Sequence, residues 1–387
     1  MKKKHIAELD ARRKQYIKDI LNKDIQDLKF CVVGAGHGGI AMAGHLAIKG
    51  FKVHLYNRGR SKIIPLNYRK KIKVEGAVNG LGKIELASNN IQDCIDGVDV
   101  IMVVIPANGH RYIAKICAPY VKENQIVILN PGRTGGALEF FHSLRQEGAQ
   151  KIPFLAEAQT FLYASRSIGP THSRIFSVKN SVPLATLPAY WIPGIIKIIN
   201  RAFPQFVPGD NIFKTSFDNI GAVFHPALSV LNAAWIEETH GNFEYYIQGA
   251  SQSVSKVLEK LDKERLDVAA ALGIKAISAR NWLYTAYSAH GKNLYEAIHD
   301  NPGYLGIKAP DSLKHRYIDE DVPMSLVPLA SIGDMLKVET PTIKFIIHIA
   351  SLIRGRDFWQ EGRTAERLGI QGMSIKEIRL FAVSGEI

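Results

Sequence analysis

The chain has 387 residues, 46% of them hydrophobic, which is enough for two cores of ordinary size and less typical of one very large domain. Its formal charge of +13 favours anionic partners, such as a phosphorylated cofactor, a carboxylate substrate or nucleic acid. The three cysteines form no CxxC pair, which indicates neither a disulfide framework nor a metal site and favours a protein of the reducing cytoplasm. No apolar run is long enough for a bilayer or a signal peptide, so no membrane partner is expected.

Residues 1–28 predict an amphipathic helical extension. Their apolar side chains recur at near-helical spacing, at Ile6, Leu9, Tyr16, Ile17, Ile20 and Leu21. Acidic residues are interleaved with the basic ones, which favours a solvated helix packed on the domain behind it over a nucleic-acid contact. The sequence leaves open whether this helix covers its own fold, contacts a second subunit of a homodimer or stays mobile.

From residue 29 onward, short apolar runs alternate with helical ones. Strands are predicted at KFCVVG, KVHLYN, VDVIMVVI, QIVILN and IPFLAEA, with a helix over about 38–49 and a hairpin-like stretch over 73–86. This alternation predicts a mostly parallel sheet with helices on both faces, in a domain over 29–195. After the turn-rich PAYWIPG the pattern becomes helical, which predicts a second domain over 210–387.

The stretch GAGHGG carries the first functional motif. Gly34, Gly36 and Gly39 form a G-x-G-x-x-G directly after a predicted strand and at the start of a predicted helix. In that context the glycines allow a tight turn, a close backbone approach to a pyrophosphate and close helix packing. The motif predicts a dinucleotide site that includes His37 and Gly38, and a merely structural glycine turn is the alternative.

The end of the next strand decides between the two nicotinamide cofactors. An acidic residue there would bind the ribose 2′-hydroxyl and repel a 2′-phosphate, but the residue is Asn57. Basic and hydroxyl side chains that suit a phosphate follow it, at Arg58, Arg60, Ser61 and Lys62. The sequence therefore predicts NADP (NADPH) in preference to NAD, with a solvated basic loop as the alternative.

Two further loops are predicted where strands of a parallel sheet end. IPANGH, with Pro106 and His110, and NPGRTGGALEF, over 130–140, contain small residues that would admit a nicotinamide. Gly135 and Gly136 could open a helix onto an anion. Ordinary strand-to-helix turns explain both loops equally well.

The helical half contains a candidate acid–base residue. His225 lies in the apolar run NIGAVFHPALSVLNAAW, where a lone histidine is more often a satisfied core group than a catalyst. The segment HRYIDEDVPMSLVP concentrates charge that would be costly to bury unpaired. Its carboxylates could orient His225, and Arg316 could clamp a substrate carboxylate; a solvated turn with a helix cap is the alternative.

Together these motifs resemble a known family. The combination of GAGHGG, PANGH, NPGRTGGALEF, AVFHPA, RYIDEDVP and GRTAERLGI is similar to the opine dehydrogenases, which include the octopine and nopaline dehydrogenases. The resemblance covers residue 29 to the end. It implies a Rossmann-type domain followed by a mainly α-helical domain like that of 6-phosphogluconate dehydrogenase.

The resemblance also implies an activity and site residues. Members join an amino acid to a 2-oxo acid, often pyruvate, through an imine that NADH or NADPH reduces. By position, His225 matches the catalytic acid–base, Asp321 its carboxylate partner and Arg316 the arginine that binds a substrate carboxylate. His110 and Asn219 match positions near the substrate, and an imidazole beside a carboxylate suits proton transfer near neutral pH.

Some features depart from the family pattern or fit other functions. Met324 and Ser325 stand where tyrosine and glycine are common in the family, which leaves the identity of the amino-acid pocket open. A simple 2-oxoacid or glycerol-3-phosphate-type reductase would use a lysine such as Lys179 beside Asn180, although their surroundings predict a strand. A non-catalytic NADP-binding sensor is a further alternative. Nucleic-acid binding is disfavoured, because no recognition module is present.

Overall fold

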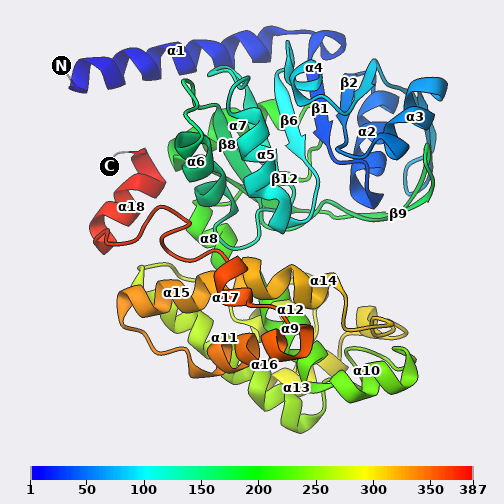
Figure 1. Ribbon diagram of the computed structural model, residues 1–387, viewed down its shortest axis with the longest axis vertical. Coiled ribbons are helices and arrows are strands. Elements are labelled where there is room, and N and C mark those ends of the chain that lie inside the picture. Colours follow the sequence, from blue (N-terminus) through cyan, green and yellow to red (C-terminus); the bar gives the residue numbers. More distant parts are fainter. Residues whose placement is uncertain (1, 386–387) are drawn as a thin grey trace. The chain divides into compact units, whose positions relative to one another are not determined.

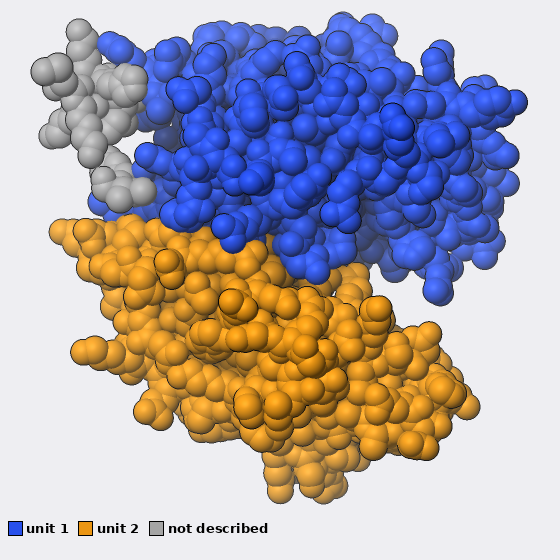
Figure 2. Space-filling model, in the orientation of Figure 1, with its two compact units in different colours: residues 1–132, 136–215, 380–387 blue, residues 133–135, 216–379 orange. Residues whose placement is uncertain are grey.

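The chain forms two compact units in the computed structural model, which describes residues 2–385 and the side chains of residues 8–385 (Figure 1). Unit 1 holds the residues before 133, residues 136–215 and those from 380 onward, and unit 2 holds residues 133–135 and 216–379 (Figure 2). These bounds differ from the sequence-based ones. Residues 133–135 join unit 2 because Thr134 N–H donates to Met324 and Gly135 N–H donates to Ser216.

Unit 1 is organised around an eight-stranded sheet. Its spatial order is β12 (Phe206–Pro208), β11 (Val182–Leu187), β8 (Phe154–Ala158), β7 (Ile126–Leu129), β6 (Val100–Val103), β1 (Lys29–Val33), β2 (Lys52–Tyr56) and β5 (Leu86–Ser88). All neighbours are parallel except β8 and β11. The strand order reverses beside β1, which has β2 on one side and β6 on the other, as in Rossmann-type folds. The predicted α/β class is confirmed.

Helices precede or connect these strands. They are α1 (Lys2–Asn22), α2 (His37–Ile48), α3 (Arg60–Arg69), α4 (Ile91–Ile95), α5 (His110–Cys117), α6 (Gly136–Gln146) and α7 (Ile192–Ile199), with 3-10 turns at Ile25–Asp27, Ala107–Gly109 and Ala189–Trp191. The unit boundary falls within α8 (Ile212–Phe217) and within α18 (Ile375–Ser384). The last residues belong to unit 1, where Phe381 packs against Phe141 with ring centroids 5.3 Å apart.

A second, four-stranded sheet also belongs to unit 1. Its order is β4 (Gly80–Lys83), β3 (Lys71–Gly76), β10 (His172–Val178) and β9 (Tyr163–Gly169). The hairpin predicted over 73–86 is confirmed as β3 and β4, which pair antiparallel. The sheet itself was not predicted, because β3 pairs in parallel with β10, a strand far along the chain that local patterns cannot connect to it.

The N-terminal helix is confirmed and packs on unit 1. Ile17 and Ile20 are buried, while Arg13 donates to the carbonyl oxygen of Ile152 at 2.7 Å. Arg201 donates to the carbonyl oxygen of Ile20 at 3.1 Å, close to where α1 ends. The side chain of Ile6, also expected on the apolar face, lies outside the described side chains. A helix held by buried apolar and arginine contacts is part of the fold of unit 1.

Unit 2 is almost entirely helical, as predicted. Its helices are α9 (Gly221–Leu231), α10 (Ala233–Thr239), α11 (Gln252–Ala271), α12 (Ala279–Tyr287), α13 (Leu294–His299), α14 (Arg316–Asp319), α15 (Val327–Leu336), α16 (Pro341–Arg354) and α17 (Phe358–Glu361), with a 3-10 turn at Pro302–Tyr304 and a π-helical turn at Val322–Leu326. Within residues 2–385, no helix combines the length and apolar character needed to cross a membrane.

Candidate cofactor and active site

The glycine turn, residues 34–39, joins β1 to α2 in unit 1. Gly34 has a φ of +115°, and a Cβ on Gly39 would lie 1.7 Å from the carbonyl oxygen of Gly34, so both positions require glycine. A Cβ on Gly36 would meet no atom of the described residues within 4 Å. The backbone at Gly36 therefore faces open space that another molecule can enter.

This turn fits a dinucleotide. The helix α2 begins at His37, and its N-cap Gly36 offers no side chain to satisfy the first N–H groups. These groups lie where the strand order reverses, beside the end of β1, which is the usual place for a pyrophosphate. The exposed glycine backbone and the uncapped helix start are the two features that such a ligand requires.

His37 and Gly38 hold the turn against a neighbouring segment of unit 1. His37 Nδ1 accepts a hydrogen bond from Ser167 N–H at 2.9 Å. A Cβ on Gly38 would lie 2.6 Å from the ring of Phe161, so a larger residue there would displace that ring. These contacts fix the position of the turn, and a direct contact of either residue with a cofactor remains a prediction.

Asn57 ties the glycine turn to the start of α3. Its side-chain oxygen accepts a hydrogen bond from Ala35 N–H at 3.0 Å, and its amide nitrogen donates to the carbonyl oxygen of Gly59 at 3.1 Å. A carboxylate could make the first of these bonds but could not donate the second. Asn57 thus contributes to the shape of the site as well as lacking a negative charge.

The basic cluster, defined as Arg58, Arg60, Ser61 and Lys62, is exposed directly after Asn57. Arg60, Ser61 and Lys62 form the first turn of α3, whose N-cap Gly59 makes no side-chain cap bond. The Arg58 guanidinium lies over the ring of Tyr112, 5.6 Å from its centroid. Free backbone N–H groups and positive side chains therefore occur together at this helix start, a combination that attracts anions.

Pro106 and His110 lie beyond the end of β6 in unit 1. Pro106 is exposed, whereas His110, the first residue of α5, is fully buried with 0% relative exposure. The exposed proline follows a strand next to β1 and suits the predicted cofactor contact. The substrate contact of His110 remains a prediction.

In unit 2 the structure brings His225 and Asp321 together. His225 Nδ1 lies 2.8 Å from Asp321 Oδ2, although 96 positions separate the two residues in the sequence. Asp321 is fully buried, while the imidazole is 19% exposed. The contact predicted between this histidine and a carboxylate of residues 315–328 is present. The exposed remainder of the ring is free to meet another molecule.

Aromatic side chains set the plane of the imidazole. The ring of Tyr317 stacks on His225 with centroids 4.1 Å apart and an interplanar angle of 18°. The hydroxyl of Tyr245 donates to the carbonyl oxygen of His225 at 2.8 Å, which holds the backbone of α9 at this point. Ring and backbone are therefore both fixed, so the direction of the second ring nitrogen is fixed as well.

Arg133 completes the surroundings of the pair. Its Nη1 lies 3.0 Å from Asp321 Oδ1, and its Nε lies 3.2 Å from Glu320 Oε1. A Cβ on Gly221 would lie 3.2 Å from both Arg133 Nη1 and His225 Nδ1, so both side chains border the start of α9. Arg133 has a φ of +61°, an uncommon conformation for a residue with a side chain.

Arg316 and Asn219 lie in the same unit. Arg316 Nε is 3.2 Å from Glu320 Oε2, and its side chain is 55% exposed. The amide of Asn219 donates to the hydroxyl of Ser325 at 3.0 Å, so a residue that departs from the family pattern has a defined partner. We call the chain of alternating charges Arg316, Glu320, Arg133, Asp321 and His225 the charged network.

The charged network keeps Asp321 ionised. Burial alone would raise the pKa of this carboxyl, but the charge of Arg133 and the hydrogen bond from His225 outweigh it and lower the pKa to about 2. An ionised Asp321 accepts the proton on Nδ1 of His225 and leaves Nε2 for proton exchange. The arrangement can therefore give and take a proton at one defined atom.

Comparison with known proteins finds relatives over most of the chain. The family model described as NAD/NADP octopine/nopaline dehydrogenase, alpha-helical domain, matches residues 208–354, and that of the NAD-dependent glycerol-3-phosphate dehydrogenase N-terminus matches residues 29–143. An opine dehydrogenase of Arthrobacter sp. (strain 1C) is 36% identical over 356 residues, which cover 92% of this chain and 99% of that protein. The chain belongs to the opine dehydrogenase family.

More distant members show the same fold. The octopine dehydrogenase of Pecten maximus is 22% identical over 301 residues, covering 69% of this chain and 73% of that one. A solved octopine dehydrogenase with NADH and L-arginine has a TM-score of 0.76 at 19% identity, over 93% of this chain and 98% of that one. The family reaction is the reductive condensation of an amino acid with a 2-oxo acid, and this chain is an NAD(P)-dependent oxidoreductase of that type.

Sequence reasoning singled out the family motif NPGRTGGALEF but missed the arginine within it. Arg133 lies between glycines and other small residues in a loop. An isolated charged side chain in such a loop was the signal that could have identified it. Lys179, the lysine of the alternative reductase, follows β10, where its amine donates to the hydroxyl of Thr160 at 2.6 Å. It lies in unit 1 and is no part of the charged network.

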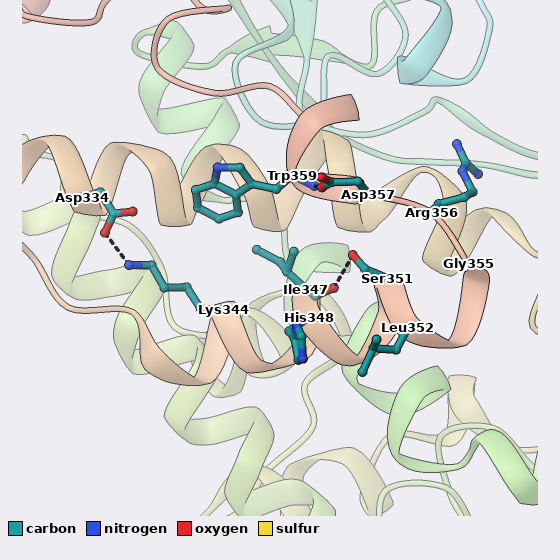
Figure 3. Close-up of a pocket in the computed structure, with 10 residues that line it drawn as sticks. All are labelled: Asp334, Lys344, Ile347, His348, Ser351, Leu352, Gly355, Arg356, Asp357 and Trp359. Carbon is teal, nitrogen blue, oxygen red and sulfur yellow. Dashed lines mark hydrogen bonds and ion pairs between the residues drawn. The ribbon is translucent and has the colours of Figure 1, made fainter.

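A pocket on unit 2 lies among α15, α16 and α17 and includes no residue of the charged network (Figure 3). Asp334 and Lys344 form an ion pair with each other, and Asp357 caps α17 by accepting from the N–H groups of Trp359 and Gln360. The carboxylates of Asp334 and Asp357 in this pocket are thus engaged in contacts within the protein, so the charged network is the better candidate for the active site.

Proposed function

We propose that this family member is an NADP-dependent opine dehydrogenase that condenses an amino acid with a 2-oxo acid such as pyruvate. The contact of 2.8 Å between His225 and the buried Asp321 carries this proposal, because loss of water from the carbinolamine and the reverse oxidation both need a group that exchanges protons near neutral pH. The amine and the oxo acid first form an imine with loss of water. Reduction of the imine then gives a secondary amine that carries two carboxylates.

His225 is the proposed acid–base residue. With Nδ1–H directed at Asp321, Nε2 in its protonated form donates to the hydroxyl of the carbinolamine, which leaves as water. Loss of water leaves an iminium, and the hydride that reduces its carbon would come from NADPH when it is bound. In the reverse direction, neutral Nε2 takes a proton from the amine. Asp321 holds the imidazole in this tautomer and balances its charge when both nitrogens are protonated.

Arg316 is the proposed ligand of a substrate carboxylate. Its side chain is 55% exposed while its Nε faces Glu320, so part of the guanidinium can meet a ligand in solution. Planar guanidinium groups bind carboxylates through two parallel hydrogen bonds. Asn219 and His110 are the further proposed substrate contacts. Asn219 would act beside Ser325, whose hydroxyl it already binds.

NADPH is the proposed reduced cofactor. The glycine turn, with Gly34, Gly36 and Gly39, would hold the pyrophosphate, and Pro106 would border the nicotinamide. The basic cluster would bind the 2′-phosphate at the start of α3, where no carboxylate opposes it. NAD lacks that phosphate and would lose these contacts. The three cysteines are buried and free, which suits the reducing cytoplasm in which we place the reaction.

The test is a matrix of amino acids against 2-oxo acids, with the absorbance of NADPH as the readout. Oxidation that requires both an amine and an oxo acid supports opine synthesis. Oxidation with the oxo acid alone would indicate a simple carbonyl reductase. Tight NADPH binding without oxidation in any pair would indicate a sensor. Mass spectrometry of the product identifies the secondary amine directly.

A further inference from the structure

We infer that Arg133 is a positioning residue that keeps Asp321 as the proton acceptor for His225. This inference rests on the proposed acid–base role of His225 and concerns how that role is sustained. Arg133 comes from the loop between β7 and α6, far in sequence from both members of the pair, and 187 positions separate it from Glu320.

The geometry places Arg133 between two carboxylates. One side of its guanidinium faces Glu320 at 3.2 Å and the other faces Asp321 at 3.0 Å. Arg133 is 8% exposed, and the two acidic side chains are 3% and 0% exposed. The other cation of the charged network, Arg316, is 55% exposed and pairs with Glu320. Arg133 is thus the buried positive charge that faces Oδ1 of Asp321, while His225 faces Oδ2.

Removal of this charge would leave two neighbouring carboxylates in the interior. Adjacent buried acids do not both stay ionised, because burial and mutual repulsion each favour the neutral form. Either Asp321 or Glu320 would then take up a proton in the ordinary assay range. With Arg133 present, the pKa of Asp321 lies well below its usual range, so the wild-type carboxylate stays charged at every assay pH.

The position of that proton decides which nitrogen of His225 is reactive. An ionised Asp321 accepts from Nδ1–H, and Nε2 is the exchanging atom. A protonated Asp321 would donate to Nδ1, and the neutral ring would then carry its own proton on Nε2. Such a ring could not accept a proton at Nε2. Arg133 therefore acts through Asp321 on the tautomer of His225 and need not touch substrate.

Among the described residues, other titratable groups also lie near His225 and Asp321. They are Glu320, Arg316, His315, Tyr317 and Tyr245, and none of these can take over the role of Arg133 beside Asp321. Burial raises the pKa of both tyrosines, so their hydroxyls stay neutral. Burial and the nearby Arg316 lower the pKa of His315, so its imidazole is neutral near neutral pH and adds no fixed charge.

The experiment measures kcat against pH for Arg133→Gln in the oxidation by NADP of the opine formed from the best substrate pair of the matrix, because in this direction Nε2 must accept a proton. We expect kcat to fall about 10²-fold near pH 6, with part of the loss recovered as the pH rises and the carboxylates ionise. The wild type should lack this additional loss of kcat at acidic pH, which we call the acidic limb of the pH profile. Arg354→Gln removes a part-buried arginine paired with Asp319 in the same unit and serves as the matched control, with an unchanged pH profile. Circular dichroism and thermal unfolding verify that each variant is folded.

A second variant separates charge from packing. Arg133→Gln combined with Glu320→Gln removes one positive and one negative charge, so Asp321 can ionise again and most of the acidic limb should disappear. Arg133→Lys should also keep the wild-type profile at lower kcat. A double variant whose kcat at pH 6 is no higher than that of Arg133→Gln, or a single variant with a wild-type pH profile, would overturn the inference.

The tautomer gives a readout that does not depend on turnover. Histidine labelled with 15N, assigned with His225→Gln, should show Nδ1–H in the wild type and Nε2–H in Arg133→Gln at neutral pH. An unchanged tautomer would contradict the role of Arg133. Absence of opine formation by the wild type would instead count against the proposed function, so the two failures are distinguishable.

Discussion

The glycine turn of unit 1 and the charged network of unit 2 are built in opposite ways. The turn is one continuous stretch of six residues, and the groups proposed to bind the cofactor are backbone N–H groups left open by missing side chains. The network unites side chains from three segments of the chain, and its members are ionisable groups that are largely buried, apart from the exposed Arg316.

This difference predicts how each region fails. A backbone site is lost when a side chain is added, because the added atoms occupy the space of the ligand. A network of buried charges is lost when a side chain is removed, because its partner remains in the interior without compensation. Substitutions of each kind should therefore separate cofactor affinity from turnover.

The largest effect is expected from His225→Ala. Turnover should fall by about 10²-fold or more, because the group that exchanges the proton is gone. NADPH affinity should stay close to that of the wild type, since the glycine turn is untouched. Steady-state kinetics and fluorescence titration measure the two quantities, and His348→Ala, an exposed histidine of α16, is the control. Unchanged turnover would remove His225 from the mechanism.

Asp321→Asn should lower turnover in the same direction, by roughly tenfold to 10²-fold, because an amide can present its N–H to Nδ1 and stabilise the wrong tautomer. Thermal unfolding should also shift downward, since Arg133 loses one of its two carboxylates. Asp334→Asn, in the exposed pair with Lys344, is the control. Wild-type kinetics in Asp321→Asn would show that the imidazole needs no anionic partner.

Replacement of both Arg58 and Arg60 by alanine should weaken NADPH about tenfold, through the loss of charge-assisted hydrogen bonds to the phosphate. NADH affinity should change little. Arg69→Ala, at the other end of α3, controls for the loss of surface charge. The ratio of the two dissociation constants is the decisive quantity, and equal weakening of both cofactors would reject the 2′-phosphate site.

The smallest effect is expected from Gly36→Ala. The added methyl group meets no described atom of the protein within 4 Å, so the free energy of unfolding should be nearly unchanged. It would stand where a pyrophosphate approaches, so affinity for NADPH and for NADH should fall together, by roughly several-fold to tenfold. Gly169→Ala, another uncrowded glycine, is the control. A variant with wild-type affinity would place the pyrophosphate elsewhere.

Much of the fold could be predicted from the sequence because its signals are local. The strands β1, β2, β6, β7 and β8 are short apolar runs with turn residues beside them, and the structure confirms them. The four-stranded sheet could not be predicted, because the pairing of β3 with β10 leaves no mark at either strand alone. The unit boundary at 215/216 likewise depends on tertiary contacts.

The same distinction applies to the two sites. The glycine spacing is sufficient to predict the turn, because each glycine has a separate local reason. The contact of His225 with Asp321 was predicted through the family resemblance, since residue spacing carries no information across 96 positions. Arg133 was missed for a related reason. Its loop has the glycines of an ordinary turn, and the value of its charge depends on carboxylates that approach only in the folded chain.

The double role of Asn57 bears on redesign of the coenzyme preference. The obvious exchange, Asn57→Asp, would add a carboxylate for a ribose hydroxyl, and one of its oxygens could still accept from Ala35 N–H. Its other oxygen would confront the carbonyl of Gly59, where the amide now donates. Two acceptors in contact repel each other, so a variant designed to bind NADH calls for a companion change that lets the first turn of α3 move away.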